Sequence, residues 1–318
     1  MQSINNIKIC EKKDFIIEGI MKSKGLYCLI AFPKVGKSML ALQIADAVAN
    51  NKLFLGHNVI SSPVLYVSTE NSASQIKVRE KLMNLCFGDN KLFVIVRDKI
   101  HQKFSLRDME YEIKKFSEDY NGRLIILDML KDIEFDFGYD INSYQDVGQK
   151  VLPKLREIAE QYNVTILFIH HLNKNGKSLG STAFDGSVDG VLRLFQSKIN
   201  KRNYKLIIEN RDYESIEQPL IKDDNCILHL CSDDDEEELS DINLILLVKY
   251  ISSNNNCEFT CTEIVNKLNL LITPKKLGKL INNNLDLLAK EGVRIEKRRT
   301  GVARTYLASY NEVVIEDD

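Results

Sequence analysis

A short segment near the amino end of this 318-residue chain carries residue types that bind nucleotide phosphates. Residues 31–38 read Ala-Phe-Pro-Lys-Val-Gly-Lys-Ser. In a loop of this kind, backbone N–H groups surround the phosphates, Lys37 reaches the β- and γ-oxygens, and the hydroxyl of Ser38 binds Mg²⁺. The pattern predicts a P-loop NTPase that takes ATP with Mg²⁺. The residues expected to contact the nucleotide are Pro33, Lys34, Val35, Gly36, Lys37, Ser38 and Met39.

The segments on both sides of the loop support this prediction. Residues 26–30 form an apolar run that is typical of a buried strand. Residues 39–45 have the pattern of a helix, and the positive amino end of that helix points at the bound anion. One position departs from the usual motif, because Ala31 replaces its first glycine, so the turn must be one that L-residues tolerate.

Two carboxylates follow apolar strands and could complete the site. Asp128 ends the run Leu-Ile-Ile-Leu-Asp, where it would lie beside the Mg²⁺ ion. The next residue is Met129, so the catalytic base must come from elsewhere. Glu70 follows an earlier strand and could orient the attacking water. The alternative for Glu70 is an ordinary solvated residue at a strand end.

The composition limits the class of protein. Hydrophobic residues make up 44% of the chain, enough for a sizeable core, and the formal charge of −2 gives no overall attraction to nucleic acid. The seven cysteines are an odd number without a Cys-x-x-Cys pair, which indicates reduced thiols. No apolar stretch approaches about 18 residues. We therefore expect a cytoplasmic protein without a membrane segment.

From about residue 15 to residue 230, short β-type runs alternate with helical patterns, which predicts an α/β fold with a doubly wound, mostly parallel sheet. Late strands follow one another without helices, so the far edge should be antiparallel. The predicted strands are 26–31, 63–68, 92–96, 123–128, 164–169, 190–195, 203–209 and 226–230. The predicted helices are 37–50, 72–86, 106–120 and 143–162.

A run of six acidic residues at 233–238 then marks a domain boundary. We divide the chain into an ATPase domain at 1–231, an acidic linker at 232–240 and a small domain at 241–318. The small domain should contain a helix at 242–251, a helix opened by a capping box at 260–263, and a third helix that begins at Thr273-Pro274. Runs at 293–299 and 302–307 predict a hairpin. Three helices with a basic hairpin indicate a winged helix-turn-helix.

The small domain is locally basic. Between Thr273 and Tyr306 there are nine Lys or Arg and three Asp or Glu, so 9 − 3 gives an excess of six positive charges. Such an excess is expected where a helix enters the major groove and a wing contacts phosphates. The alternative is a winged helix used for protein contacts. The candidate DNA-binding residues are Lys275, Lys276, Lys279, Lys297, Arg298, Arg299 and Arg304.

The placement of Asp128 and Glu70 on separate strands resembles RecA-like ATPases, and within them the hexameric helicases of DnaB and RepA type. The resemblance covers roughly residues 10 to 230. In that group the first glycine of the loop is often alanine with a proline two positions on, as in Ala31-Phe32-Pro33. The resemblance also implies that His170, near the end of the strand at 164–169, senses the γ-phosphate.

The same resemblance implies contacts with single-stranded DNA and with neighbouring subunits. His171 and Lys174 would lead into a central loop within 173–190, where Lys174 and Lys177 would hold a phosphate backbone. A disordered connection is the alternative for this segment. Arg211 would be an arginine finger acting on a neighbour, with Arg193 as second choice. A contact that repeats from copy to copy implies a ring or a filament.

Two functions fit these residues. One is an ATP-dependent DNA helicase or translocase, similar to proteins that replicate plasmids, phages and integrated elements. The other is a replication initiator, loader or regulator in which ATP sets the assembly state and no strand is separated. The helicase is a motor and needs the central loop and the arginine finger. The initiator or regulator is an ATP-dependent switch and needs neither.

Overall fold

The fold is taken from a computed structural model that describes residues 15–96, 104–140, 143–171, 186–196, 201–231, 233–270, 272–299 and 304–311. Contacts between Cα atoms divide the chain into two compact units. The larger comprises 1–195, 206–217 and 223–227, and the smaller comprises 196–205, 218–222 and 228–318. Within the described ranges, every helix is too short or too polar to cross a membrane.

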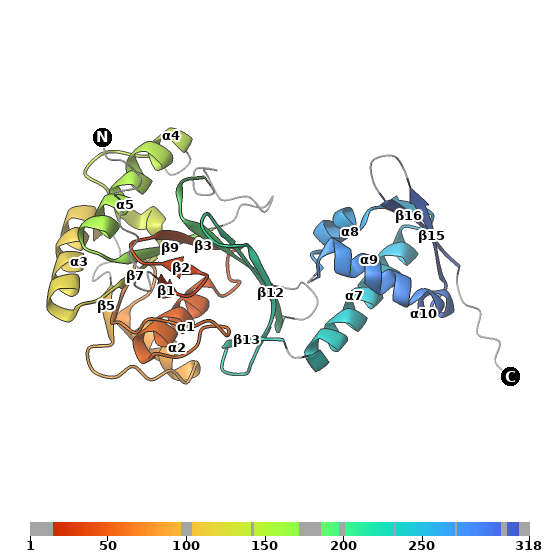
Figure 1. Ribbon diagram of the computed structural model, residues 1–318, viewed down its shortest axis with the longest axis horizontal. Helices are drawn as coiled ribbons and strands as arrows, with labels where there is room; N and C mark the ends of the chain where they lie inside the picture. Colours follow the sequence, from red (N-terminus) through yellow and green to blue (C-terminus); the bar gives the residue numbers. More distant parts are fainter. Residues whose placement is uncertain are drawn as a thin grey trace, which may run out of the picture. The chain divides into compact units, whose positions relative to one another are not determined.

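A nine-stranded sheet organises the fold, with the order β13-β12-β11-β10-β3-β9-β7-β4-β5 among the described residues (Figure 1). Its central strands are parallel: β3 pairs with β9 and β10, and β7 pairs with β9 and β4. Their bounds are β3 Leu26–Ala31, β4 Val64–Ser68, β5 Leu92–Val96, β7 Leu124–Asp128, β9 Thr165–His171 and β10 Gly190–Gln196. The predicted α/β fold with a mostly parallel sheet is confirmed.

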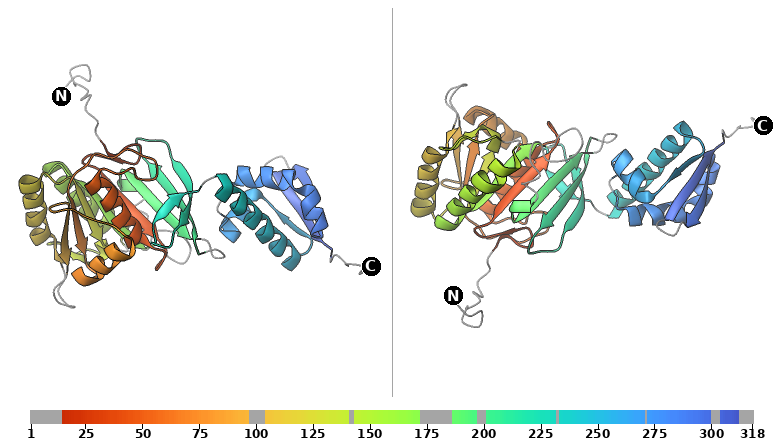
Figure 2. Two further views of the ribbon diagram at one scale, coloured as in Figure 1. Left: turned by 90° about the horizontal axis from the view of Figure 1, so that it is seen from below. Right: turned by 90° about the horizontal axis from the view of Figure 1, so that it is seen from above.

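Helices cover both faces of this sheet. In Figure 1, α1 (Lys37–Asn50) and α2 (Ala73–Leu82) lie on one side, and α3 (Leu106–Tyr120) and α5 (Leu152–Gln161) on the other. The views from below and above in Figure 2 show the two layers in turn. The short α4 (Tyr144–Asp146) and the π-helical turn η3 (Val147–Val151) lead into α5. The ranges 37–50 and 106–120 agree with prediction at both ends.

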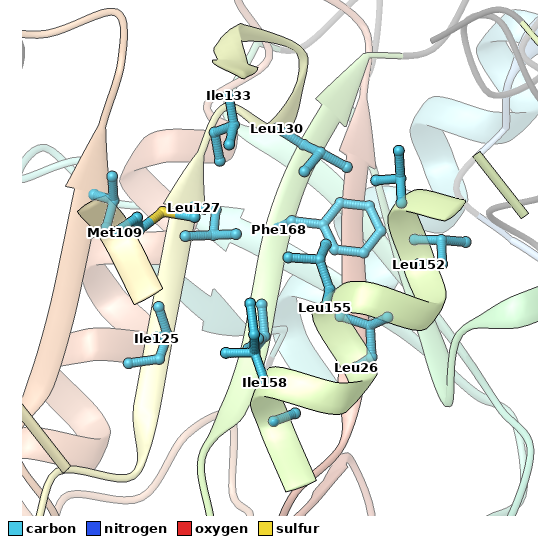
Figure 3. Close-up of a cluster of buried hydrophobic side chains, with 14 of the residues drawn as sticks. Leu26, Met109, Ile125, Leu127, Leu130, Ile133, Leu152, Leu155, Ile158 and Phe168 are labelled. Atoms are coloured by element: carbon cyan, nitrogen blue, oxygen red, sulfur yellow. The ribbon is translucent and has the colours of Figure 1, made fainter. Parts of the chain in front are cut away.

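The main core lies between the sheet and the layer formed by α3 and α5. Alternate residues of each strand point to opposite faces, and Leu127 and Phe168 belong to the set that meets Met109 and Leu155 (Figure 3). Asp128 has the opposite parity, so its side chain belongs to the face covered by α1. The alternation therefore separates the apolar core from the polar site.

The outer part of the sheet contains strands without intervening helices. These are β11 (Asn203–Asn210), β12 (Ile216–Lys222) and β13 (Leu228–Leu230), and β12 pairs with β13 in antiparallel fashion as expected. Sequence analysis missed β12, whose polar residues and Pro219 hide its strand character. It also missed the small pairs of β1 (Phe15–Ile17) with β2 (Met21–Lys22), and of β6 (Phe104–Ser105) with β8 (Ile133–Glu134).

The carboxy-terminal body, from α7 to β16, has its own hydrophobic core. Its helices are α7 Asp233–Ser253, α8 Cys261–Leu268, α9 Pro274–Asn283 and α10 Leu285–Lys290, and its sheet has the order β14-β16-β15. The strands are β14 Cys257–Phe259, β15 Val293–Arg299 and β16 Arg304–Tyr310. Side chains of Thr260 and Thr273 cap α8 and α9, as their sequence signatures predict.

The acidic run differs from prediction. We expected an acidic linker at 232–240 and a helix from Ile242, but α7 already begins at Asp233. Acidic residues are favourable in the first turn of a helix, because they compensate the positive end of its dipole. The first residues of the run thus lie where a helix favours negative charge.

A buried carboxylate anchors the base of β10 in the larger unit. Asp189, whose side chain is 3% exposed, lies 3.0 Å from Nζ of Lys22 and 2.9 Å from Nη1 of Arg156. The N–H of Leu26 also donates to it at 2.8 Å. These partners hold the pKa of Asp189 below its usual value although burial acts in the other direction. Asp189 therefore connects β2, β3, α5 and β10.

We expect Asp189→Asn to lower the free energy of unfolding by about 3 kcal/mol, because breaking a buried pair leaves the guanidinium of Arg156 without its counter-charge. Asp212→Asn is the matched control. Asp212 pairs with the same Lys22 at 2.8 Å but is 50% exposed, so its loss should cost less than about 1 kcal/mol. Urea denaturation followed by circular dichroism measures both. Equal losses would mean that Asp189 is not the anchor.

Candidate nucleotide-binding site

The phosphate loop connects β3 to α1 with a backbone that only some residues adopt easily. Gly36, with φ of 107°, precedes the first residue of α1, and Lys34 has φ of 65°. A positive φ of this size favours glycine at position 36. Nζ of Lys37 donates to the carbonyl oxygens of Ala31 and Phe32, at 3.2 and 3.1 Å. The loop therefore holds Lys37 at the carboxyl end of β3.

The electrostatic environment of Lys37 favours an anionic ligand. Burial lowers the pKa of this lysine to about 8, an effect that the charges of Asp128 and Glu70 partly offset. Both of these hydrogen-bond partners of the ammonium group are neutral carbonyl groups. A phosphate would supply the charge that these carbonyl groups lack.

Asp128 is at the end of β7 and is 1% exposed. The hydroxyl of Tyr66 donates to its Oδ2 at 2.7 Å, and the side chain of Ser38 is close enough to lower the pKa values of both residues. Burial raises the pKa of Asp128, whereas these two neighbours lower it. The pKa of Tyr66 is raised by burial and by the neighbouring carboxylate, so its hydroxyl is a neutral donor. The two predicted Mg²⁺ ligands, Ser38 and Asp128, thus lie together.

The turns that follow β4 and β7 are joined through Thr69. Its N–H donates to the carbonyl oxygen of Asp128 at 2.7 Å, and its hydroxyl oxygen accepts from the N–H of Met129 at 2.9 Å. The same hydroxyl lies 3.1 Å from Oδ2 of Asp132, within the short helical turn η2 (Leu130–Asp132). The peptide bond between Asp128 and Met129 is cis. Glu70 is therefore attached to the turn that carries Asp128.

Glu70 lies at this junction with its side chain partly exposed. On its other side, Asn71 donates its N–H to Ser68 at 3.1 Å and accepts from Arg79 at 2.9 Å. Oε1 of Glu70 is 3.3 Å from Nζ of Lys131, a residue of η2. The residues on both sides of Glu70 are thus held by hydrogen bonds. The charge of Glu70 raises the pKa values of Lys37 and Asp128.

The two histidines that end β9 face opposite sides of the sheet. His170 has the parity of Phe168, which points towards α5. His171 has the other parity, and its pKa is lowered to about 4 by burial and by the charges of Lys37 and Lys131. Its buried Nδ1 has no hydrogen-bond partner among the described residues. The resemblance implied a sensing role for His170, whereas His171 is the histidine that faces the side of the sheet with Lys37.

The two finger candidates lie at different heights along the sheet, Arg193 in the middle of β10 and Arg211 just after β11. Arg193 is paired in register with Ile30 and donates from Nε to Glu209 at 2.9 Å. Arg211 is beside Asp189, whose carbonyl oxygen accepts its N–H at 2.9 Å, and its guanidinium donates to the carbonyl oxygen of Gly186. Arg211 therefore lies at the end of β3 away from its own phosphate loop. Lys174 and Lys177 lie outside the described residues.

The predicted DNA-binding surface belongs to the carboxy-terminal body. On α9 the lysines at 275, 276 and 279 are exposed, whereas Leu277 and Ile281 are buried. On β15, Lys297 and Arg298 are exposed. The side chains of Arg299 and Arg304 lie outside the described set. The spacing thus places the described cations on the solvent side of this body.

Sequence reasoning missed four residues of the site: Tyr66, Thr69, Arg79 and Lys131. The only available signal for Tyr66 was a hydroxyl group in an otherwise apolar strand, two residues before Ser68. Thr69 and Lys131 gain their roles from the pairing of β4 with β7, which the sequence does not reveal. The charge of Arg79 acts on Asp128 from α2, beyond any local motif.

The described residues fit a nucleotide with Mg²⁺. The loop N–H groups and Lys37 would hold the phosphates, and Ser38 and Asp128 would hold the metal, directly or through water. Space above Gly36 is open, since an added Cβ would meet no atom within 4 Å. Bound Mg²⁺ would neutralise charge on the phosphate oxygens. The loop, strand and carboxylate arrangement defines a RecA-like P-loop NTPase.

Comparison with known families agrees with this class. The model of the family described as AAA domain matches residues 8–177, so the chain belongs to that family. The described fold extends beyond the match, since β10 begins at Gly190 and pairs with β3.

Relatives named DNA repair protein RadA match a similar part of the chain. The protein from Aquifex aeolicus is 30% identical over 189 residues, which is 59% of this chain and 38% of that protein. The protein from Helicobacter pylori strain J99 is 28% identical over 183 residues, which is 56% of this chain and 35% of that protein. The chain thus spans little more than a third of the length of these relatives.

Among solved structures, the KaiC-like protein PH0186 from Pyrococcus horikoshii OT3 is similar. It is 15% identical with a TM-score of 0.48, and the match covers 70% of this chain and 98% of that one.

We expect Tyr66→Phe to weaken Mg²⁺-dependent nucleotide binding roughly tenfold, because a group that orients a metal ligand affects metal affinity by this order. Affinity for a fluorescent ATP analogue, measured with Mg²⁺ and with EDTA, checks this. The loss should occur only with Mg²⁺.

Tyr27→Phe is the matched control for this measurement. Tyr27 is as buried as Tyr66, and its hydroxyl accepts the N–H of Lys22 at 2.8 Å, near the start of β3. Binding by this variant should equal that of the wild type. An equal loss in both variants, or a loss in EDTA, would contradict a link from Tyr66 to the metal.

Proposed function

We propose that this protein is an ATP-dependent DNA helicase or translocase of RepA/DnaB type that acts in replication of a mobile element. The observation that carries this proposal is the assembly of Lys37, Asp128 and Glu70 at one end of a mostly parallel sheet, with Glu70 on a separate strand from Asp128. The basic segment from Thr273 to Tyr306 and the RadA relatives, named for DNA repair, support DNA as the partner.

Each residue of the site has a distinct task. Lys37 binds the phosphates, and Ser38 and Asp128 hold Mg²⁺ with the help of Tyr66. Glu70 orients the water that attacks the γ-phosphate, and it is close enough to the site for its charge to raise the pKa of Lys37. His171 reports the presence of the γ-phosphate at the end of β9, from which the chain runs on towards Lys174.

DNA contacts and assembly complete the proposal. Lys174 and Lys177 would contact single-stranded DNA, and the carboxy-terminal body would act as a winged helix on duplex DNA. Because Arg211 lies away from its own phosphate loop, it would act on the nucleotide of a neighbouring copy. Copies joined in this way form a homo-oligomeric ring. We assign ATP hydrolysis to residues 1–231 and duplex binding to residues 241–318.

A second function is favoured by one observation. Both finger candidates are engaged within their own chain, Arg193 by Glu209 and Arg211 by Gly186. Glu209 also stands where the helicase group has lysine. This arrangement suits a replication initiator, loader or regulator in which ATP sets the assembly state without separating strands.

We expect single-stranded DNA to stimulate ATP hydrolysis and ATP to drive opening of a forked duplex. Lys37→Ala should lose nucleotide binding, whereas Glu70→Gln should keep binding and lose about 100-fold or more in hydrolysis, because only the base is removed. Phosphate release and strand separation are the measurements. A fork that stays closed while ATP binds would favour the switch, and full hydrolysis by Glu70→Gln would place the base elsewhere.

We expect joint replacement of Lys297, Arg298 and Arg299 by alanine to weaken duplex binding and to reduce its salt slope by about 2 to 3, since each phosphate contact contributes about 0.9. Fluorescence anisotropy at several salt concentrations measures the slope. A triple replacement of the exposed lysines 114, 115 and 150 of the larger unit removes equal charge as a control. An unchanged slope in the first variant would assign the hairpin to a protein partner.

A further inference from the structure

Lys131 is a lysine beside the phosphate site that the mechanism above does not use. It lies in η2, three residues after Asp128, and its side chain is 37% exposed. Its Nζ is 3.3 Å from Oε1 of Glu70, whose side chain is 42% exposed. The proposed base is therefore paired with a cation from the turn that follows the metal ligand.

The backbone around Lys131 is held by hydrogen bonds on both sides of the residue. On one side Met129 donates its N–H to Thr69, and on the other Asp132 lies 3.1 Å from the hydroxyl of Thr69. The turn itself is closed by the N–H of Asp132, which donates to the carbonyl oxygen of Met129. A lysine has four carbons between backbone and charge, so its ammonium group can move between nearby partners.

The charge of Lys131 reaches the phosphate site. It lowers the pKa of Lys37 and that of His171, the two groups that face the phosphates. Like charges gathered around one space favour an anion within it. Ion pairs between partly exposed side chains are weak, so a group with several negative charges competes successfully for the lysine.

We propose that Lys131 is a second phosphate-binding cation, which Glu70 holds until a nucleoside triphosphate enters. Its transfer to the γ-phosphate frees the carboxylate of Glu70 for the attacking water. Binding of the triphosphate thereby releases the catalytic base Glu70 from its ion pair with Lys131. A diphosphate lacks the γ-phosphate and leaves this ion pair intact. This inference rests on the proposed nucleotide site and adds a discrimination between ATP and ADP.

The test compares affinities for a nonhydrolysable ATP analogue and for ADP by calorimetry. Lys131→Ala should weaken triphosphate binding about tenfold and leave ADP binding unchanged, because one charged contact is lost. Lys131→Arg should keep most of the preference. Lys150→Ala is the matched control, since Lys150 forms an exposed ion pair with Asp146, 2.6 Å away, on the helical layer of the other face.

A double-mutant cycle tests the competition between Glu70 and phosphate. Glu70→Gln should raise triphosphate affinity several-fold, because a neutral amide holds Lys131 less strongly, and this gain should vanish in the variant that also carries Lys131→Ala. An unchanged ratio of ATP to ADP affinity in Lys131→Ala, or additive effects in the cycle, would overturn the inference alone. A wild type that binds neither nucleotide would overturn the proposed function as well.

Discussion

The hydroxyl and backbone of Thr69 join the two turns from which Glu70, Asp128 and Lys131 project. Strands β4 and β7 are separated by about sixty positions in the sequence, and their parallel pairing brings Ser68 beside Asp128. The hydrogen bonds of Thr69 then continue this pairing past the ends of both strands. Without these hydrogen bonds, the backbones of the two turns would not be held together. The distances among Glu70, Asp128 and Lys131 would then not be fixed. The geometry of the site therefore depends on one threonine that does not itself meet the phosphates.

Local patterns were sufficient to predict the elements that carry the loop. The strand at 26–31 and the helix at 37–50 agree with the structure because an apolar run, a positive-φ glycine and a helix start all lie within twenty residues. Asp128 was found for a similar reason, since its own strand ends at the carboxylate. Tyr66 and Lys131 were not found, because their partners come from other strands. His170 and His171 face opposite sides of the sheet, and which of those sides carries the site depends on which helices cover each face.

In the carboxy-terminal body, the acidic run did not reveal where the first helix begins. Six acidic residues in succession predicted a linker between domains, and in the structure they lie at the start of α7, where a helix accepts negative charge. By contrast, the starts of the capped helices α8 and α9 and the strand at 293–299 agree with prediction, since their start residues act locally. The segments α9 and α10 were expected as a single helix, and β14 was not predicted because its pattern is too short to stand out from its neighbours.

The place of β10 in the sheet has a consequence for how the chain can be divided. The family match ends at residue 177, but β3, which carries the phosphate loop, is paired on one side by β10 from residue 190 onward. A fragment that stopped at residue 177 would also lack Asp189, whose carboxylate binds the N–H of Leu26 at the start of that strand. Its central strand would become an edge, with unpaired backbone groups open to other chains. The smallest piece of this protein that keeps the loop supported on both sides is thus longer than the segment by which its family is recognised.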